Sequence, residues 1–176
     1  ADGATVSSIT GYLGIDTFDL GAYTSAVDLE LSPLVSSGIF GFDGSATGTP
    51  PGTPNPVGGT FAGVDLVIGG SATDSLTGLD SPTNWAVDAG SNQYTDVGTG
   101  VSLTFTAIES LNGGSDVDAF AVLGSQVANL SGGDGNDSFT FANAAVLTGN
   151  VDGGSGIDIV DVDAYTTNVD FTISGA

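Results

Sequence analysis

The 176-residue sequence contains no lysine, arginine, histidine, cysteine or methionine. Nucleic-acid binding depends on basic side chains against phosphate, so this class of function is excluded. The bases and nucleophiles of Ser–His–Asp, Cys–His and Schiff-base enzymes are missing, as are the usual zinc ligands. No apolar run reaches membrane-spanning length and no basic segment marks a signal peptide, so we expect no membrane insertion.

The acidic residues have no basic partner. There are 21 of them, the formal net charge is −21, and all but Glu30 and Glu109 are aspartates. Aspartate favours turns over helices, because its short side chain competes for the backbone. Folding must therefore work against self-repulsion unless the solvent supplies cations. Hard divalent cations with oxygen ligands, Ca²⁺ first among them, are the natural candidates.

The rest of the composition describes a folded, turn-rich chain. Hydrophobic residues make up 40%, which separates it from disordered acidic tails, and the 29 glycines indicate frequent tight turns. We expect a single domain covering residues 1–176. A surface rich in Gly, Thr and Ser, with acids as its only charges, favours a secreted, extracellular or cell-surface location.

A short motif recurs five times: Gly, four variable residues, Asp, one further residue, then a large apolar residue. The last three copies start 19 and 21 residues apart, which is the length of one coil of a β-solenoid. The fold class predicted is therefore all-β, a parallel β-solenoid (β-roll or β-helix) of about seven to eight coils. The five motifs start at Gly11, Gly69, Gly113, Gly132 and Gly153, with Asp16, Asp74, Asp118, Asp137 and Asp158 at the sixth position.

The stretches between the motifs are typical of strands. Residues 103–111 and 169–173 alternate between apolar and polar side chains, and no segment gives a convincing helix. Residues 47–60 hold four of the six prolines. Because proline cannot donate to a strand ladder, we expect a surface loop inserted between coils at about residues 47–60.

A longer repeat links the two halves of the chain. Residues 15–32 and 157–174 match at nine of eighteen positions without a gap, including Asp16 with Asp158 and Tyr23 with Tyr165. The last part of the sequence thus repeats the first part, as expected for one period of a tandem array or a polymer. We expect copies of the chain to associate head to tail, with calcium bridging Asp158 of one copy and an N-terminal acid such as Asp2 or Asp16 of the next.

The motifs at Gly132 (G-G-D-G-N-D-S-F) and Gly153 (G-G-S-G-I-D-I-V) resemble the hemolysin-type, or repeats-in-toxin, calcium-binding repeat G-G-x-G-x-D-x-U-x. The resemblance implies a parallel β-roll with Ca²⁺ between successive turns, held by the sixth-position aspartate and by glycine carbonyls. The ligands so implied are Asp118, Asp137 and Asp158, with Gly113, Gly132 and Gly153, then Asp116 and Asp134 in the same turns, and Asp74 and Asp16 in weaker motifs.

The sequence departs from that family in two ways. Its repeats are not continuous nonapeptides, so only one turn in each coil carries the motif. The fourth position, where a positive φ calls for glycine, holds Asp116 in one motif and Ala72 in another. The overall pattern is similar to giant modular bacterial surface proteins, in which sparse motifs of this kind interrupt long β-strand repeats.

The function we expect is a structural subunit or repeat module of a calcium-stabilised extracellular filament, sheath or surface layer. An adhesin-type module that binds sugar, a surface or ice is the alternative, and it requires a flat, regular face. Each sixth-position aspartate can also be explained without metal, by backbone N–H groups within its turn. The paired acids Asp116/Asp118 and Asp161/Asp163 have a spacing that glycosidases could use, but solvation or metal binding explains them without a substrate, and we expect no enzymatic activity.

Overall fold

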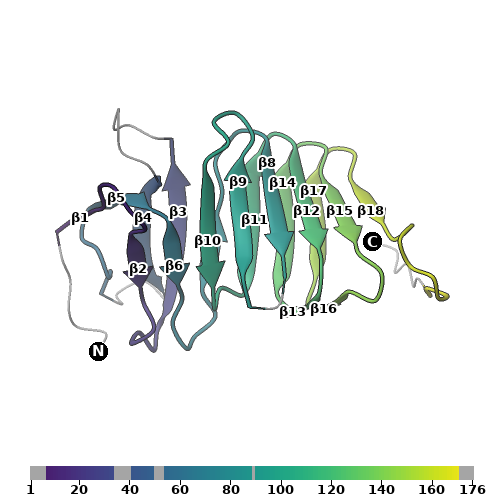
Figure 1. The fold of residues 1–176 in the computed structure, drawn as a ribbon, viewed down its shortest axis with the longest axis horizontal. Coiled ribbons are helices and arrows are strands. Elements are labelled where there is room, and N and C mark those ends of the chain that lie inside the picture. The colour runs from purple at the N-terminus through teal and green to yellow at the C-terminus, as the bar shows by residue number, and fades with distance from the viewer. Residues whose placement is uncertain (1–6, 34–40, 50–53, 89, 171–176) are drawn as a thin grey trace.

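A computed structural model describes residues 7–33, 41–49, 54–88 and 90–170. Within these ranges the chain forms eighteen β-strands and no helix, and hence no helix that could span a membrane. The all-β class predicted from the sequence is confirmed. Two eight-stranded sheets and one two-stranded sheet contain all the described strands. Both large sheets extend along the long axis of the molecule, one in front of the other in the view of Figure 1.

The first large sheet has the strand order β1-β5-β4-β3-β7-β11-β14-β17. Its strands are β1 (Ile9–Thr10), β5 (Thr60–Val64), β4 (Phe42–Thr49), β3 (Ala26–Ser32), β7 (Ser75–Thr77), β11 (Ser110–Ser115), β14 (Asn129–Asp134) and β17 (Val151–Ser155).

The second large sheet has the order β18-β15-β12-β8-β9-β10-β6-β2. Its strands are β18 (Ile159–Asp161), β15 (Ser138–Phe141), β12 (Asp118–Val122), β8 (Thr83–Val87), β9 (Asn92–Asp96), β10 (Ser102–Thr106), β6 (Leu66–Ile68) and β2 (Thr17–Asp19). Strands β13 (Ser125–Val127) and β16 (Val146–Thr148) form the small parallel sheet.

The C-terminal half has the parallel pairing expected of a solenoid. From β11 to β18 the chain passes from the first large sheet to the second and returns through β13 or β16 of the small sheet. Strands β7, β11, β14 and β17 pair in parallel, as do β8, β12, β15 and β18. The N-terminal half differs, because β3–β4–β5 and β8–β9–β10 are antiparallel. Short connections explain part of this. Residues 97–101 between β9 and β10 are too few for a parallel crossover, which needs a dozen or more.

The core consists of two in-register rows that face each other across the sheets. One is aliphatic, with Leu29, Leu76, Leu111 and Leu130 in successive strands, all at most 1% exposed. The other is aromatic and contains Trp85, Phe120 and Phe139 in successive strands. The ring centroids of Trp85 and Phe120 lie 5.3 Å apart and those of Phe120 and Phe139 5.1 Å apart, nearly parallel in both cases. Alternating side chains thus bury one face of each strand.

Two expectations about local structure need correction. Residues 103–111 are not one strand: β10 ends at Thr106, the backbone turns at Ala107 with φ 53°, and β11 starts at Ser110. The proline-rich loop is shorter than 47–60, because residues 47–49 end β4 and residue 60 starts β5. Residues 50–53 of that loop, and 171–173 of the expected strand at 169–173, lie outside the described residues.

Candidate functional site in the glycine–aspartate turns

Three of the five motifs stack on one edge of the molecule. The turns at residues 113–118, 132–137 and 153–158, called here the stacked turns, each carry the chain from the first large sheet to the second. Their second glycines, Gly114, Gly133 and Gly154, are in register. The turn at residues 11–16 joins β1 to β2 in the same direction, at the N-terminal end. The turn at residues 69–74 runs the opposite way, from β6 to β7, so Asp74 lies outside this stack.

A sixth turn continues the stack and was missed from the sequence. Residues 78–83 (G-L-D-S-P-T) lie one coil before residues 113–118, because Asn112 pairs with Thr77 and Asp118 pairs with Thr83. Thr83 stands where the other motifs have aspartate, which hid the relationship. The remaining signal was glycine at the first position and the apolar Trp85 at the eighth.

Each stacked aspartate folds back onto the first glycine of its own turn. A Cβ placed on Gly113 would overlap Oδ2 of Asp118 and the carbonyl oxygen of Gly132 in the next coil. A Cβ on Gly132 would overlap Oδ2 of Asp137 and the carbonyl oxygen of Gly153 in the same way. The first position therefore requires glycine because a carboxylate and the neighbouring backbone occupy the space of a side chain.

The carboxylates also link successive coils. The N–H of Asp118 donates to Oδ1 of Asp137 at 2.8 Å, and the N–H of Asp137 donates to Oδ1 of Asp158 at 2.9 Å. The same arrangement recurs elsewhere, from Asp16 N to Asp65 Oδ2, from Val27 N to Asp74 Oδ1 and from Asp74 N to Glu109 Oε2. In every case the carboxylate belongs to the strand layer nearer the C-terminal end. We call this series the carboxylate ladder.

The second carboxylate oxygens in the stack have no donor. Oδ2 of Asp118 and Oδ2 of Asp137 are buried and accept no hydrogen bond from the described part of the chain, although the residues are only 0% and 1% exposed. Leaving a buried charged oxygen unpaired is costly. The backbone carbonyls of Gly132 and Gly153, which crowd the same glycines, add further negative potential.

Burial and charge shift the pKa values of these two carboxyls. Burial raises the pKa of Asp118 to about 7, against the opposing effect of a hydrogen bond from the Thr83 hydroxyl and with a further contribution from the charge of Asp137. Burial likewise raises the pKa of Asp137, the Asp118 N–H lowers it, and the charge of Asp158 raises it again. In both carboxyls the nearby hydrogen bonds do not fully offset the cost of burying the ionised form.

The other expected ligands have different surroundings. Asp116 and Asp134 are exposed on the outside of the stacked turns, and Asp116 has φ 91°, at the fourth position where Gly135 has φ 143°. Both oxygens of Asp74 already accept backbone N–H groups, from Val27 and Gly70. Asp16 accepts one N–H through Oδ2, from Tyr12.

A cation in the stack would have a sparse set of side-chain ligands. Within the described residues no three acidic side chains gather closely enough to hold a metal ion. The unpartnered oxygens of Asp118 and Asp137 nevertheless fit a hard cation, because they are carboxylate oxygens beside glycine carbonyls with no competing donor. Most remaining ligands would have to be backbone carbonyls or water.

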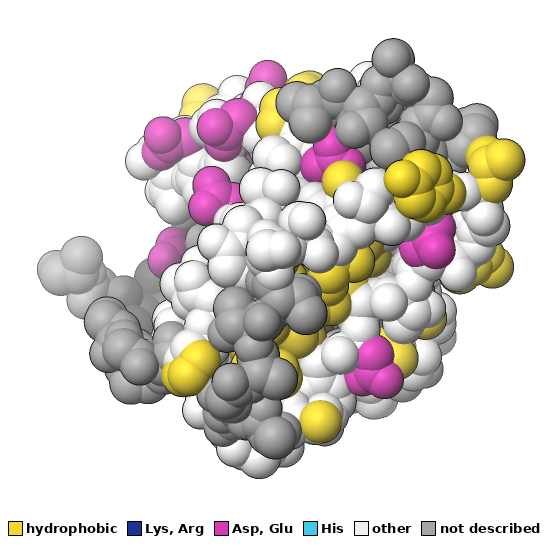
Figure 2. Space-filling model, turned by 90° about the vertical axis from the view of Figure 1, so that its left-hand side faces the viewer, with side chains coloured by type: hydrophobic (Ala, Val, Ile, Leu, Met, Phe, Trp, Pro, Cys, Tyr) yellow, Lys and Arg dark blue, Asp and Glu magenta, His cyan; other side chains and the backbone are white. Residues whose placement is uncertain are grey.

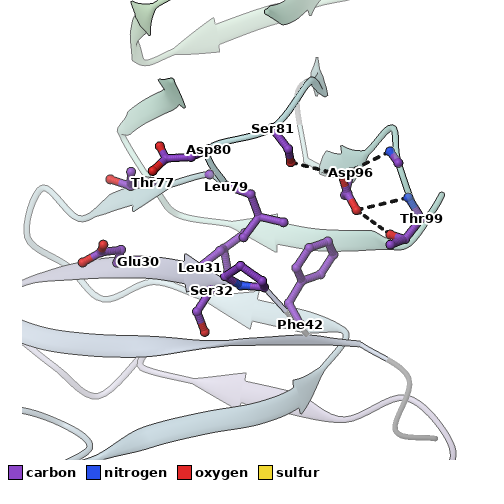
Figure 3. A pocket seen from close by; sticks show the side chains of 13 residues that line it. Glu30, Leu31, Ser32, Phe42, Thr77, Leu79, Asp80, Ser81, Asp96 and Thr99 are labelled. Carbon is purple, nitrogen blue, oxygen red and sulfur yellow. Dashed lines mark hydrogen bonds between the residues drawn. The ribbon is translucent and has the colours of Figure 1, made fainter. Parts of the chain in front are cut away.

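A hollow of about 600 Å³ lies beside residues 78–83 (Figure 3). Leu31, Phe42 and Leu79 form its apolar part, and Asp96 lies at its edge. Burial opposes ionisation of Asp96, but hydrogen bonds from Thr99, Gly98 and Ser81 outweigh it and lower the pKa. The bonds from Thr99 and Gly98 tie Asp96 to the β9–β10 turn, and the bond from Ser81 ties it to the turn at residues 78–83.

No protein-family model matches the chain, and neither the curated proteins nor the solved structures give a match.

Proposed function

We propose that this chain is a structural module of a calcium-stabilised extracellular filament, sheath or surface layer, and that its copies assemble head to tail. The observation that carries the proposal is the open stacking at both ends. Strands β1 and β2 end the two sheets on one side and β17 and β18 on the other, with no further strand beyond them in the described residues. Unpaired strand edges invite the addition of another strand.

Exposed apolar side chains at both ends support assembly. At the C-terminal end Val160 is 50% exposed although it continues the buried aromatic row after Phe139. An apolar hollow on the same coil is lined by residues that include Phe141, Leu147 and Val162. At the opposite end, hydrophobic side chains lie in the middle of the end face and acidic ones mostly nearer its rim (Figure 2). A stacked neighbour would remove both apolar areas from water.

Calcium has a specific role in the proposal. Bound near Asp118 and Asp137, it would supply the positive charge that the chain lacks and relieve the mutual repulsion of the stacked carboxylates. Asp158 and the carbonyls of Gly113, Gly132 and Gly153 are the further ligands proposed. Because such binding favours the folded state, its free energy adds to stability.

The test is thermal unfolding combined with sedimentation, in millimolar calcium and in excess EDTA. The proposal expects EDTA to lower the melting temperature by tens of degrees and to dissolve the large particles that form in calcium. An identical melting curve in EDTA would remove the role of calcium, and a strictly monomeric particle at high protein concentration in calcium would remove the role in assembly.

One observation favours the adhesin alternative. On the first large sheet Thr77, Asn112 and Ser131 stand in register at half-buried positions that alternate with the buried leucines, giving a regular polar row with the strand spacing of about 4.8 Å. A sugar or surface ligand could use such a row. Binding of the monomeric module to a glycan array, lost in the Asn112→Lys variant, would support this function over the structural one.

A further inference from the structure

We infer that the last described coil of one copy, residues 151–161, docks on the first described coil of the next, residues 9–19, and continues both large sheets and the carboxylate ladder across the junction. This inference rests on the proposed function and names its contact. Its central pair is the N–H of Asp158 in one copy and Oδ1 of Asp16 in the next.

The two coils have the same local shape. Gly14 has φ 124° and Gly156, at the equivalent position, has φ 135°. Downstream, Gly21 N donates to Asp19 Oδ1 at 2.8 Å, and Asp163 N donates to Asp161 Oδ1 at 2.8 Å. The sequence match between the coils is therefore a match of backbone conformation, so each can occupy the place of the other in a stack.

A further pair of hydrogen bonds extends this match. Tyr23 N donates to Leu20 O at 2.7 Å, and Tyr165 N donates to Val162 O at 2.9 Å. These bonds set the direction in which the chain leaves β2 and β18. An incoming copy therefore meets a coil that it can continue on both sheets.

The ladder is incomplete at the two ends in complementary ways. Asp74 shows the complete pattern, with Oδ2 accepting from its own turn and Oδ1 from the preceding layer. Asp16 has only the first half: Oδ2 accepts Tyr12 N, and Oδ1 accepts nothing from the described residues. Asp158 accepts from Asp137, but its own N–H has no acceptor among them. The N-terminal end of the stack thus has an acceptor without a donor, and the C-terminal end has a donor without an acceptor.

The polarity of the ladder fixes the orientation of the junction. Within one chain the carboxylate always lies in the layer nearer the C-terminal end, and the N–H that it accepts comes from the layer before. Asp158 N can therefore be matched only by a layer added beyond the C-terminal coil. The Asp16 carboxylate can be matched only by a layer placed before the N-terminal coil. Head-to-head or tail-to-tail contacts satisfy neither.

The packing rows and the close approaches fit the same junction. Val160 would lie next to the buried Phe18 of the next copy, as it lies next to Phe139 within its own chain. A Cβ on Gly156 would overlap the Gly135 carbonyl of the preceding coil, whereas a Cβ on Gly14 meets nothing within 4 Å. None of the described residues occupies the space before Gly14, where the Gly156 turn of another copy would lie.

The first coil departs from the stacked turns at one position. Tyr12 stands where Gly133 and Gly154 have positive φ, and it is 69% exposed. The φ of Tyr12 is not positive, so its side chain leaves the turn in a different direction from a Cβ on those glycines. Gly70, at this position of the Asp74 turn, also lacks a positive φ, and a Cβ there would lie 2.6 Å from the Tyr23 carbonyl oxygen of the preceding layer. The incoming turn must therefore leave room for the Tyr12 side chain at the junction.

The junction can be blocked separately at each end. Ile159 N donates to Asp137 O inside the stack, so the equivalent Thr17 N would donate to Asp158 O of the preceding copy. Thr17→Pro removes this donor from an exposed edge position, where proline is tolerated, and Thr17→Val is the matched control. At the other end, Val160→Asp places a charge in the junction, and Leu123→Asp is the matched control, because Leu123 is also 50% exposed but lies outside both docking coils.

The experiment is sedimentation velocity in millimolar calcium, with circular dichroism to confirm that each variant is folded. We expect Thr17→Pro and Val160→Asp to be monomers alone and to form a dimer, and nothing larger, when mixed, because one junction remains possible. Thr17→Val and Leu123→Asp should assemble like the unmodified chain. Assembly of both blocked variants at the unmodified level would overturn this junction while leaving the proposed function standing, and failure of the unmodified chain to assemble would overturn both.

Discussion

The main-chain N–H of Asp118 donates to the Oδ1 atom of Asp137 at 2.8 Å, across 19 residues of sequence. This one bond explains why the sixth position of the motif recurs as aspartate. A short carboxylate can bend over a glycine in its own turn and still reach the backbone of the coil before. Glutamate takes this role only once among the described residues, at Glu109, on the opposite edge of the molecule.

Stability should depend on pH through Asp118. In the folded chain burial raises the pKa of this carboxyl to about 7, from 3.8 ordinarily. Between about pH 4 and pH 7 the folded state holds a proton that the unfolded state has released, so this carboxyl makes stability fall as the pH rises through that range. Melting temperatures in EDTA should show this fall. It should be smaller in Asp118→Asn, where Asp137 keeps its own raised pKa, and unchanged in the exposed control Asp134→Asn.

The same substitution separates a proton from a cation as the partner of Asp118. At pH 8 in EDTA, Asp118→Asn should stabilise the fold by about 1–3 kcal/mol, because it removes a buried unpaired charge. In calcium it should reduce the stabilisation that the cation provides. An Asp118→Asn variant with an unchanged response to calcium would show that this carboxylate is not a ligand.

Asp137→Asn should weaken calcium binding, whereas Asp74→Asn should weaken the fold itself. The amide oxygen introduced by Asp137→Asn can still accept the Asp118 N–H, but the ionised oxygen that has no other partner is lost, so calcium affinity should fall about tenfold or more. At Asp74 both oxygens accept N–H groups, so Asp74→Asn removes an acceptor and the fold should lose about 1–3 kcal/mol with or without calcium. Calcium titration by calorimetry and urea unfolding measure the two effects. Equal losses of affinity would contradict the assignment.

The first glycine of a stacked turn should not tolerate alanine. In Gly132→Ala the new methyl group meets Oδ2 of Asp137 and the Gly153 carbonyl, so overpacking should cost about 1–3 kcal/mol. Gly98→Ala is a suitable control, because its nearest atom beyond its chain neighbours, Oδ1 of Asp96, would be at an ordinary 3.5 Å. The control should stay within about 0.5 kcal/mol of the unmodified chain in urea unfolding. A tolerated Gly132→Ala would mean that the turn can open.

The sequence predicted the parts of the fold that depend on repeated local chemistry. The motifs at Gly113, Gly132 and Gly153 form stacked turns about one coil apart. The calcium role and the assembly remain predictions.

The antiparallel insertions escaped notice because alternating strands have the same pattern in either direction, and only connection length distinguishes them. The inward orientation of Asp118 and Asp137 also could not be read from the sequence. The motif gives the residue type at the sixth position, whereas the neighbouring coil decides which atoms surround it.

The most direct test of the central claim is the axial repeat of the material assembled in calcium, measured by cryo-electron microscopy. If each copy continues the stack, it adds the eight strand layers of the large sheets at about 4.8 Å each, so the subunit rise should be about 38 Å. Within that repeat the β17 and β18 strands of one copy should pair with β1 and β2 of the next. A filament whose copies contact each other only side by side, with these edge strands unpaired between copies, would contradict the account.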